Sequence, residues 1–307
     1  MAGNYNIIVV TGPTATGKTN FAVQLARKFD GEIISADSRQ VYRGMSLGSG
    51  KDLNDYVVDG KIIPYHCIDI ADAGKKYNVF EFQRDFLHAF LTIENKGKTP
   101  ILCGGTGMYI EAVLSAYKLI QVPPNDILRE ELEKYTLDEL AKMLSKMKKL
   151  HNKSDVDTKK RAIRGIEIET YYLNHPAEKN NYPEIKPFIL ALHFDREVIR
   201  KRITTRLKQR FADGMLDEAK TLLNSGLKSA DLEYYGLEYK FMAQHLSGQI
   251  TYQQMFDRLN TAIHQFAKRQ MTWFRRMERN GFKINWIDGN LNMEGKIALA
   301  TRLYTEK

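Results

Sequence analysis

The segment that most constrains the fold is an eight-residue run near the start of the chain, Gly12-Pro-Thr-Ala-Thr-Gly17-Lys18-Thr19. It follows an apolar stretch, Ile7 to Val10, and precedes residues 20–29, whose apolar side chains recur every fourth position as on one helix face. A Gly-x4-Gly-Lys-Thr run between a strand and a helix turns backbone N–H groups toward phosphate oxygens, and its threonine hydroxyl can join the shell of a Mg²⁺ ion. The run therefore predicts a cradle for phosphate or pyrophosphate, made of Gly12, Pro13, Thr14, Ala15, Thr16, Gly17, Lys18 and Thr19.

The rest of the chain supplies a sheet and a separate helical segment. Three further short apolar runs, Glu32 to Ser35, Pro100 to Cys103 and Phe188 to Phe194, are typical of buried strands. We therefore expect an α/β fold with a three-layer core like that of P-loop NTPases, built on a parallel sheet. From Pro123 to about His175 the sequence is charged and its leucines recur at helical intervals, which predicts a helical insertion. The expected division is core at 1–120, insertion at 121–185 and core at 186–307, helical from Arg196 onward.

Composition limits the partners and the compartment. The chain has 307 residues, enough for a sizeable core, and 46 Lys plus Arg against 37 Asp plus Glu, which leaves a formal charge of +9 and favours a polyanionic partner such as nucleic acid. Its two cysteines, Cys67 and Cys103, lack the spacing of a zinc site or a disulfide framework. No apolar run has membrane-spanning length, and the first ten residues do not resemble a signal peptide. We expect a soluble, cytoplasmic monomer without membrane contact.

The position of acidic residues separates kinds of phosphate chemistry. Nucleotide hydrolases of this type usually hold magnesium with an acid after a neighbouring strand, but Pro100 to Cys103 is followed by Gly104-Gly105-Thr106-Gly107. The strand at Glu32 to Ser35 instead leads to Asp37, at the edge of the sheet where ligands of open α/β folds bind. Asp37 is therefore the main candidate for an acid in the site. The alternative is a capping or Asx-turn aspartate.

Three basic segments favour contact with nucleic-acid phosphates over an ordinary solvated surface. The first is 259–276, where a helical projection separates apolar Leu259, Ile263, Phe266 and Trp273 from polar Lys268, Thr272 and Arg275. We expect Trp273 and Phe274 to be core residues rather than stacking platforms for bases. The second is 159–164, and the third is 196–210, where three arginines recur every fourth residue with no opposing acids: Arg202, Arg206 and Arg210.

Five motifs together resemble one family. GPTATGKT, ISADSRQVYRGM, GGTGMY, RAIRGIEIE and AKRQMTWFRR occur in the order found in tRNA dimethylallyltransferases and span nearly the whole chain. The resemblance implies that the phosphate cradle binds dimethylallyl pyrophosphate. It also implies that the acceptor is the exocyclic amine of the adenosine just 3′ of the anticodon, in the anticodon stem-loop of tRNA.

The resemblance assigns roles residue by residue. Asp37 resembles the general base, Thr19 with Mg²⁺ stabilises the leaving group, and Lys18 and Arg275 contact the pyrophosphate. Thr106 resembles the hydroxyl that positions the target nucleotide, although on the sequence alone it could simply satisfy its own turn. The tRNA contacts implied are Asp37, Ser38, Arg39, Gln40, Thr106, Arg129, Lys160, Arg161, Ala162, Ile163, Arg164, Lys268, Arg269, Gln270, Thr272 and Arg275.

Three stretches depart from the family pattern. Ile263-His264-Gln265 stands in place of Thr-Arg-Gln, 47–52 reads LGSGKD in place of IGTAKP, and Gly236-Leu237-Glu238-Tyr239-Lys240 stands where the family commonly has an Ile-Gly-Tyr run. These changes bear on which anticodon loops are accepted. Three other functions stay open: a P-loop small-molecule kinase, a catalytically silent tRNA-binding protein, and a prenyltransferase acting on free adenylate, which has little use for the helical insertion.

Overall fold

The computed structural model describes residues 5–119, 121–148, 150, 156–175 and 182–306. The chain forms two compact units. The first combines Met1–Ala116 with Glu184–Lys307, and the second is Tyr117–Pro183. Most of the Asn/Pro-rich stretch that precedes the return to the first unit lies outside the described residues.

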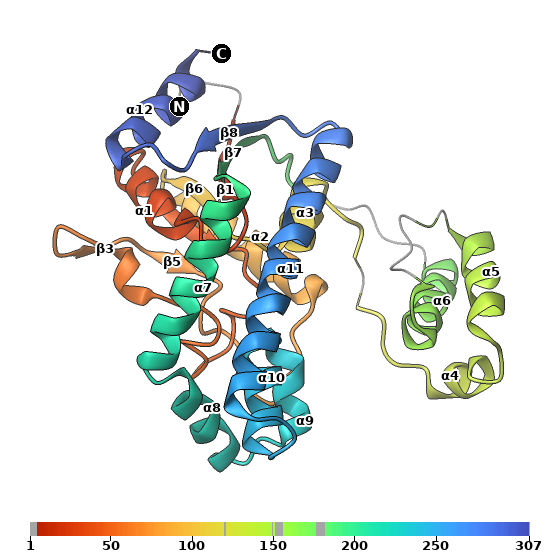
Figure 1. Cartoon of the computed structure of the whole chain (residues 1–307). Helices are drawn as coiled ribbons and strands as arrows, with labels where there is room; N and C mark the ends of the chain where they lie inside the picture. Colours follow the sequence, from red (N-terminus) through yellow and green to blue (C-terminus); the bar gives the residue numbers. More distant parts are fainter. Residues whose placement is uncertain (1–4, 120, 149, 151–155, 176–181, 307) are drawn as a thin grey trace. The chain divides into compact units, whose positions relative to one another are not determined.

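The first unit is built on a six-stranded sheet in the order β5-β2-β6-β1-β7-β8, and every neighbouring pair is parallel. The four predicted strands are confirmed to within one residue at each end. Strands β1, β2, β6 and β7 are buried over almost their whole length, which explains why they appear in the sequence as continuous apolar runs. The bounds are β1 Ile7–Thr11, β2 Gly31–Ser35, β5 Tyr65–His66, β6 Thr99–Cys103, β7 Pro187–His193 and β8 Ile284–Asp288 (Figure 1).

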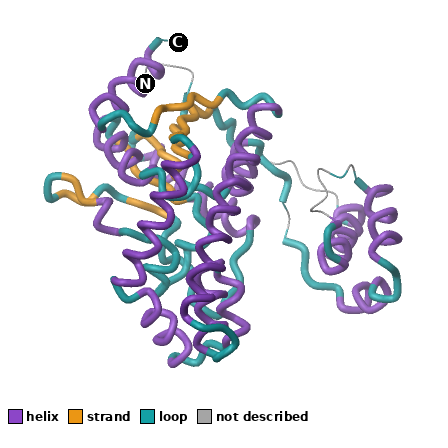
Figure 2. Tube along the Cα trace, in the orientation of Figure 1, coloured by secondary structure: helices purple, strands orange, loops and turns teal. Residues whose placement is uncertain are grey.

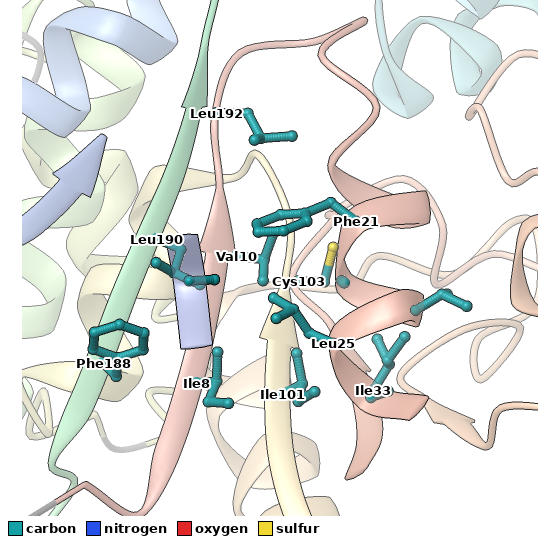
Figure 3. Packing of buried hydrophobic residues seen from close by; sticks show 14 of the residues in the cluster. Ile8, Val10, Phe21, Leu25, Ile33, Ile101, Cys103, Phe188, Leu190 and Leu192 are labelled. Carbon is teal, nitrogen blue, oxygen red and sulfur yellow. The ribbon is translucent and has the colours of Figure 1, made fainter. Parts of the chain in front are cut away.

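Helices cover both faces of this sheet. On one face α1 (Lys18–Lys28) inserts Phe21 and Leu25 among the apolar side chains of β1, β6 and β7, with α12 (Met293–Thr305) beside it (Figure 3). Right-handed crossovers place the helices that follow β5 and β6 on the opposite face. These are α2 (Val79–Asn95) and α3 (Gly107–Leu114), which pack together. The α/β fold with a parallel sheet is therefore confirmed.

The segment between β7 and β8 is helical, as predicted. Its longest helix, α11, begins at a capping box formed by Thr251 and Gln254 and lies side by side with α7 (Figure 1). The bounds are α7 Arg196–Ala212, α8 Met215–Asn224, α9 Ser229–Leu232, η3 Glu233–Tyr235, α10 Leu237–Leu246 and α11 Tyr252–Arg279. Before β5, the short helix η1 (Leu53–Tyr56) leads into a hairpin of β3 (Val57–Val58) and β4 (Lys61–Ile62) that projects from this unit (Figure 2).

The second unit contains three helices, α4 (Asp126–Leu132), α5 (Leu137–Met147) and α6 (Lys159–Asn174), and no strand among its described residues. A separate apolar core joins them, and α6 approaches α5 closely because Gly165 faces the Leu144 side chain. The core residues are Leu132, Leu140, Leu144, Ala162, Ile163 and Ile166.

Two sequence-based expectations are wrong. The chain after Arg196 is not helical throughout, because 284–288 form β8, an edge strand paired only with β7 whose Asn285 and Asp288 interrupt the apolar pattern. Phe266 does not belong to the apolar face of α11, since it is 38% exposed and lies beneath Arg269, while the buried stripe continues through Ala267, Gln270 and Phe274.

Cys67 and Cys103 are both buried free thiols. Among the described residues, none of the helices is both long enough and apolar enough to cross a membrane.

Candidate functional site

The phosphate cradle joins β1 to α1 and has a backbone that few residues can adopt. Gly12, Ala15 and Gly17 all have positive φ angles, of 142°, 63° and 78°. A side chain at Gly12 would bring its Cβ to 2.7 Å from the carbonyl oxygen of Leu192, so the loop passes directly over the end of β7. Ala15 tolerates a conformation that strains any residue with a Cβ, which is common where a loop is shaped for a ligand. This backbone is of the kind that gathers N–H groups around an anion.

Two helices hold the cradle from the side. From α7, the Arg202 Nε donates to the Ala15 carbonyl at 2.8 Å and the Arg206 guanidinium donates to the Thr14 hydroxyl at 3.1 Å. From α11, the buried Gln270 accepts a hydrogen bond from the Thr14 N–H at 2.9 Å and donates to the Gly105 carbonyl at 2.8 Å. Gln270 thus fastens the loop after β1 to the loop after β6.

The ammonium of Lys18 lies in a crowded, cationic environment. Its Nζ is 3.4 Å from the carbonyl oxygen of Pro13. Burial lowers the pKa of Lys18, the charge of Arg206 lowers it further, and Cys103 and Asp37 act in the opposite direction. A negative ligand in the cradle would stabilise this desolvated charge.

Asp37 and Thr106 lie at the neighbouring strand ends. The loops after β2 and β6 touch, because a side chain at Gly104 would collide with the Ala36 carbonyl. The Ser38 N–H donates to the Thr106 hydroxyl at 3.1 Å, so that hydroxyl joins the two loops. The alternative that Thr106 only satisfies its own turn is therefore wrong.

Asp37 combines a structural contact with a free oxygen. Its Oδ1 accepts the Arg39 N–H at 2.9 Å, which is the Asx turn weighed as the alternative for this residue. Its other carboxylate oxygen has no hydrogen-bond partner among the described residues, so it remains available to a ligand. The same carboxylate contributes to the electrostatic environment of both Lys18 and Arg206.

The exposed side of α11 borders a cleft. Lys268, Thr272 and Arg275 line it together with Pro13 of the cradle, and its volume is about 710 Å³. His264 lies in the same cleft, where burial lowers its pKa against the opposing effect of a hydrogen bond to the Arg200 backbone. A groove of about 870 Å³ between α1 and α12 contains none of the motif residues. Of these two hollows, the cleft beside α11 is the one lined by a residue of the cradle.

The predicted tRNA contacts in the first unit differ in availability. Arg39 donates to the Tyr234 carbonyl at 2.7 Å, and Gln40 donates to the Gly50 carbonyl at 3.1 Å and accepts from the Ser35 hydroxyl at 2.9 Å. Gln270 is also fully engaged inside the protein. The two glutamines thus serve the architecture of the loops, whereas Lys268, Arg269, Thr272 and Arg275 are exposed.

In the second unit, too, some of the predicted tRNA contacts are engaged inside the protein and others are exposed. Arg129 forms a bidentate pair with the buried Glu167, at 2.9 and 3.0 Å, and Arg164 pairs with the same carboxylate. The side chains of Ala162 and Ile163 belong to the core. Lys160 and Arg161 are exposed, and Arg161 has an ion pair with Asp157 at 2.8 Å.

Magnesium would find one protein ligand here. Thr19 lies in the first turn of α1, directly after the cradle glycine Gly17 and Lys18, and the described residues contain no group of three or more acidic, histidine or cysteine side chains that could hold a metal ion. This arrangement fits Mg²⁺, which is commonly bound by one or two protein groups, substrate phosphates and water.

Sequence reasoning did not connect the arginines of α7 with the cradle. Their four-residue spacing was visible, but only the structure shows that Arg202 and Arg206 reach Thr14 and Ala15. The expectation that these arginines face no acids is wrong for Arg210, which is buried and forms an ion pair with the exposed Asp52 at 3.6 Å.

The glycine-rich loop is held at the carboxyl edge of a parallel sheet, Asp37 follows a neighbouring strand, and a glycine turn stands where an acid would follow β6. These features define a P-loop protein suited to bind a phosphate-bearing ligand. The chain belongs to the IPP transferase family. The family model described as IPP transferase matches residues 40–277, and the model described as isopentenyl transferase matches residues 5–63.

Similar proteins cover almost the whole chain. The chain is 58% identical over 294 residues to the tRNA dimethylallyltransferase 2 of Bacteroides fragilis, with 96% of each protein covered. It is 55% identical over 300 residues to the tRNA dimethylallyltransferase 1 of Parabacteroides distasonis, with 98% of each covered. Among solved structures, the full-length tRNA isopentenylpyrophosphate transferase of Bacillus halodurans is 30% identical, has a TM-score of 0.66, and is matched over 98% of this chain and 99% of its own.

Proposed function

We propose that the protein transfers a dimethylallyl group from dimethylallyl pyrophosphate to the exocyclic amine of the adenosine 3′ of the anticodon in tRNA. The observation that carries the proposal is the placement of a free carboxylate oxygen of Asp37 beside the Lys18 phosphate cradle, in a loop joined through Thr106 to the adjacent strand end. The names of relatives that match this chain end to end support the same donor and acceptor.

The chemistry follows from these positions. The cradle, Lys18, Arg206 and Arg275 hold the diphosphate where negative charge accumulates as the allylic carbon–oxygen bond breaks. The amine nitrogen attacks that carbon, and Asp37 accepts the proton that the nitrogen releases. The products are the prenylated adenosine and pyrophosphate. Mg²⁺ held at Thr19 would neutralise part of the leaving group's charge.

The acceptor base has to leave its stack to reach this site. An adenine amine within a stacked anticodon loop is inaccessible, and extruding a base costs a few kcal/mol. The loop joined by Asp37, Ser38 and Thr106 is the proposed seat of the extruded base. We further propose that the helical unit, through Lys160 and Arg161, and the exposed face of α11 contact tRNA phosphates.

The direct test is to incubate the protein with unmodified tRNA, Mg²⁺ and dimethylallyl pyrophosphate and to analyse the nucleosides by mass spectrometry. The expected product is N6-dimethylallyladenosine at the position 3′ of the anticodon, formed without ATP. Product on free adenylate but not on tRNA would indicate the adenylate prenyltransferase instead. ATP turnover on a small molecule without prenyl transfer would favour the kinase alternative.

A further inference from the structure

Arg210 is an unusual arginine because it is buried and only partly paired. It follows Arg206 by one turn of α7, is 7% exposed, and its Nη2 has no hydrogen-bond partner among the described residues. The closest acid is Asp52, whose Oδ2 lies 3.6 Å away, beyond hydrogen-bond distance. The backbone of Gly50 covers the guanidinium so closely that a side chain there would collide with it. A buried guanidinium in this state needs compensation from another charge.

Glu238 is in place to supply that compensation. It lies in the first turn of α10 and lines, with Arg206, Arg210, Thr14 and Ala15, a cavity of about 20 Å³ next to the cradle. Desolvation raises the pKa of Glu238, and Asp37 adds to this effect, while its own backbone N–H and the charges of Arg210 and Arg206 oppose it only in part.

Arg206 and Arg210 carry like charges on adjacent turns of α7, so they repel each other. Desolvation and the charge of Arg210 together lower the pKa of Arg206 to about 10, against the opposing effects of Asp52, Glu238 and Asp37. Arg206 nevertheless remains charged near neutral pH, and it is the arginine that contacts the Thr14 hydroxyl. Repulsion from Arg210, one helical turn away, acts to move Arg206 from this contact.

We propose that Glu238 and Arg210 are positioning residues that hold Arg206 in a fixed orientation over the phosphate cradle, and so set the affinity for the donor's diphosphate. The inference rests on the proposed function, because it takes the cradle to be the diphosphate site. Glu238 offsets the repulsion between the two arginines across the cavity that all three side chains line, and the charge of Arg210 attracts Glu238 so that this carboxylate does not draw Arg206 away from Thr14.

The sign of one substitution separates positioning from simple electrostatics. If Glu238 acted only through its negative charge, Glu238→Gln would strengthen the binding of an anionic diphosphate. A positioning role predicts the opposite, since Arg206 is then displaced by Arg210. In Arg210→Met the unpaired Glu238 competes for Arg206, so binding also weakens. When both are replaced, the repulsion and the competitor disappear together.

The experiment is calorimetric titration of the full-length protein with inorganic pyrophosphate and Mg²⁺, which needs neither tRNA nor turnover. We expect Glu238→Gln and Arg210→Met each to weaken binding about tenfold, and the double variant to bind within about threefold of the parent. Glu233→Gln and Lys208→Met, exposed changes of the same kinds on η3 and α7, serve as controls. Arg210→Lys, which keeps the charge, should bind within about threefold and replaces Arg210→Met if that variant fails to melt cooperatively.

Tighter binding by Glu238→Gln, or losses that simply add in the double variant, would overturn the inference. A merely structural role would lower the melting temperature of both single variants without this non-additive pattern in affinity. If the parent protein binds no pyrophosphate, both the proposed function and this inference are wrong. If the parent binds pyrophosphate but the affinities of the variants do not follow the expected order, only the inference is wrong.

Discussion

Asp37 has two oxygens with different tasks, and this allows the base to be tested without disturbing its loop. Asp37→Asn keeps an oxygen that can accept the Arg39 N–H, but it cannot take a proton from the adenine amine. We expect single-turnover prenyl transfer, with donor and tRNA saturating, to fall roughly 10²- to 10⁴-fold while the melting temperature and tRNA affinity hold. Asp59→Asn, in the exposed β3–β4 hairpin, is the control. A rate within about fivefold of the parent would remove the base assignment.

The lowered pKa of Lys18 predicts how the affinity for the donor depends on pH. Burial and Arg206 lower its pKa in the free protein, and a bound diphosphate raises that pKa again. Donor binding therefore takes up a proton between the lowered pKa of Lys18 in the free protein and its higher pKa in the complex, and the affinity for Mg²⁺–pyrophosphate declines as pH rises through this window. Titrations should show this decline in the parent and less of it in Lys18→Arg, whose guanidinium does not titrate. Equal slopes in both proteins would assign the decline to the ligand alone.

At the scale of elements, the stability of α6 depends on the buried carboxylate of Glu167. Glu167 accepts from Arg129, from Arg164 and from the Asn125 N–H, and these contacts lower its pKa against the effect of desolvation. Glu167→Gln leaves two arginines without their charge partner. We expect a loss of about 2 kcal/mol, below the 3–5 kcal/mol of a fully buried pair because both arginines are partly exposed.

Hydrogen exchange is the measurement for Glu167→Gln. Amides of α4 and α6 should exchange faster in the variant while those of β1 and β6 keep their protection. Glu169→Gln, a half-exposed change two residues later on the same helix, should leave α6 nearly unchanged. Uniform loss of protection across both units would contradict a local role.

The elements also show where sequence reasoning succeeds. Strands β1, β2, β6 and β7 were predicted closely because burial on both faces demands unbroken apolar runs. The edge strand β8 was not, since one partner strand requires less apolar sequence. Spacing correctly grouped the arginines of α7 but could not indicate which neighbour they face. Similarly, a motif placed Gln270 among the tRNA contacts, yet only tertiary packing reveals that both ends of its amide are bonded within the protein.

At the scale of the whole molecule, the net charge of +9 predicts salt-sensitive tRNA binding. Log affinity should fall linearly with log salt concentration, because phosphate contacts release counterions. Replacing Lys160 or Arg161 with glutamine should each reduce the slope by roughly one unit. Arg164 is less suitable for this test, since it holds Glu167. Lys75→Gln, at an exposed lysine of the first unit, is the comparison, and a slope near zero in the parent would remove the electrostatic contribution.

Gly12 and Gly104 have a consequence for how such a site can change over time. Each is pressed against a neighbouring carbonyl, that of Leu192 or that of Ala36, and leaves no room for even one methyl group. Mutational drift at these two positions is therefore blocked by backbone, which cannot yield as a side chain can. New specificities have to arise on the surrounding helices, and the departures at His264 and Glu238 lie there, on α11 and α10. We therefore expect the loops at Gly12 and Gly104 to stay the same among related proteins, while the residues on the surrounding helices change.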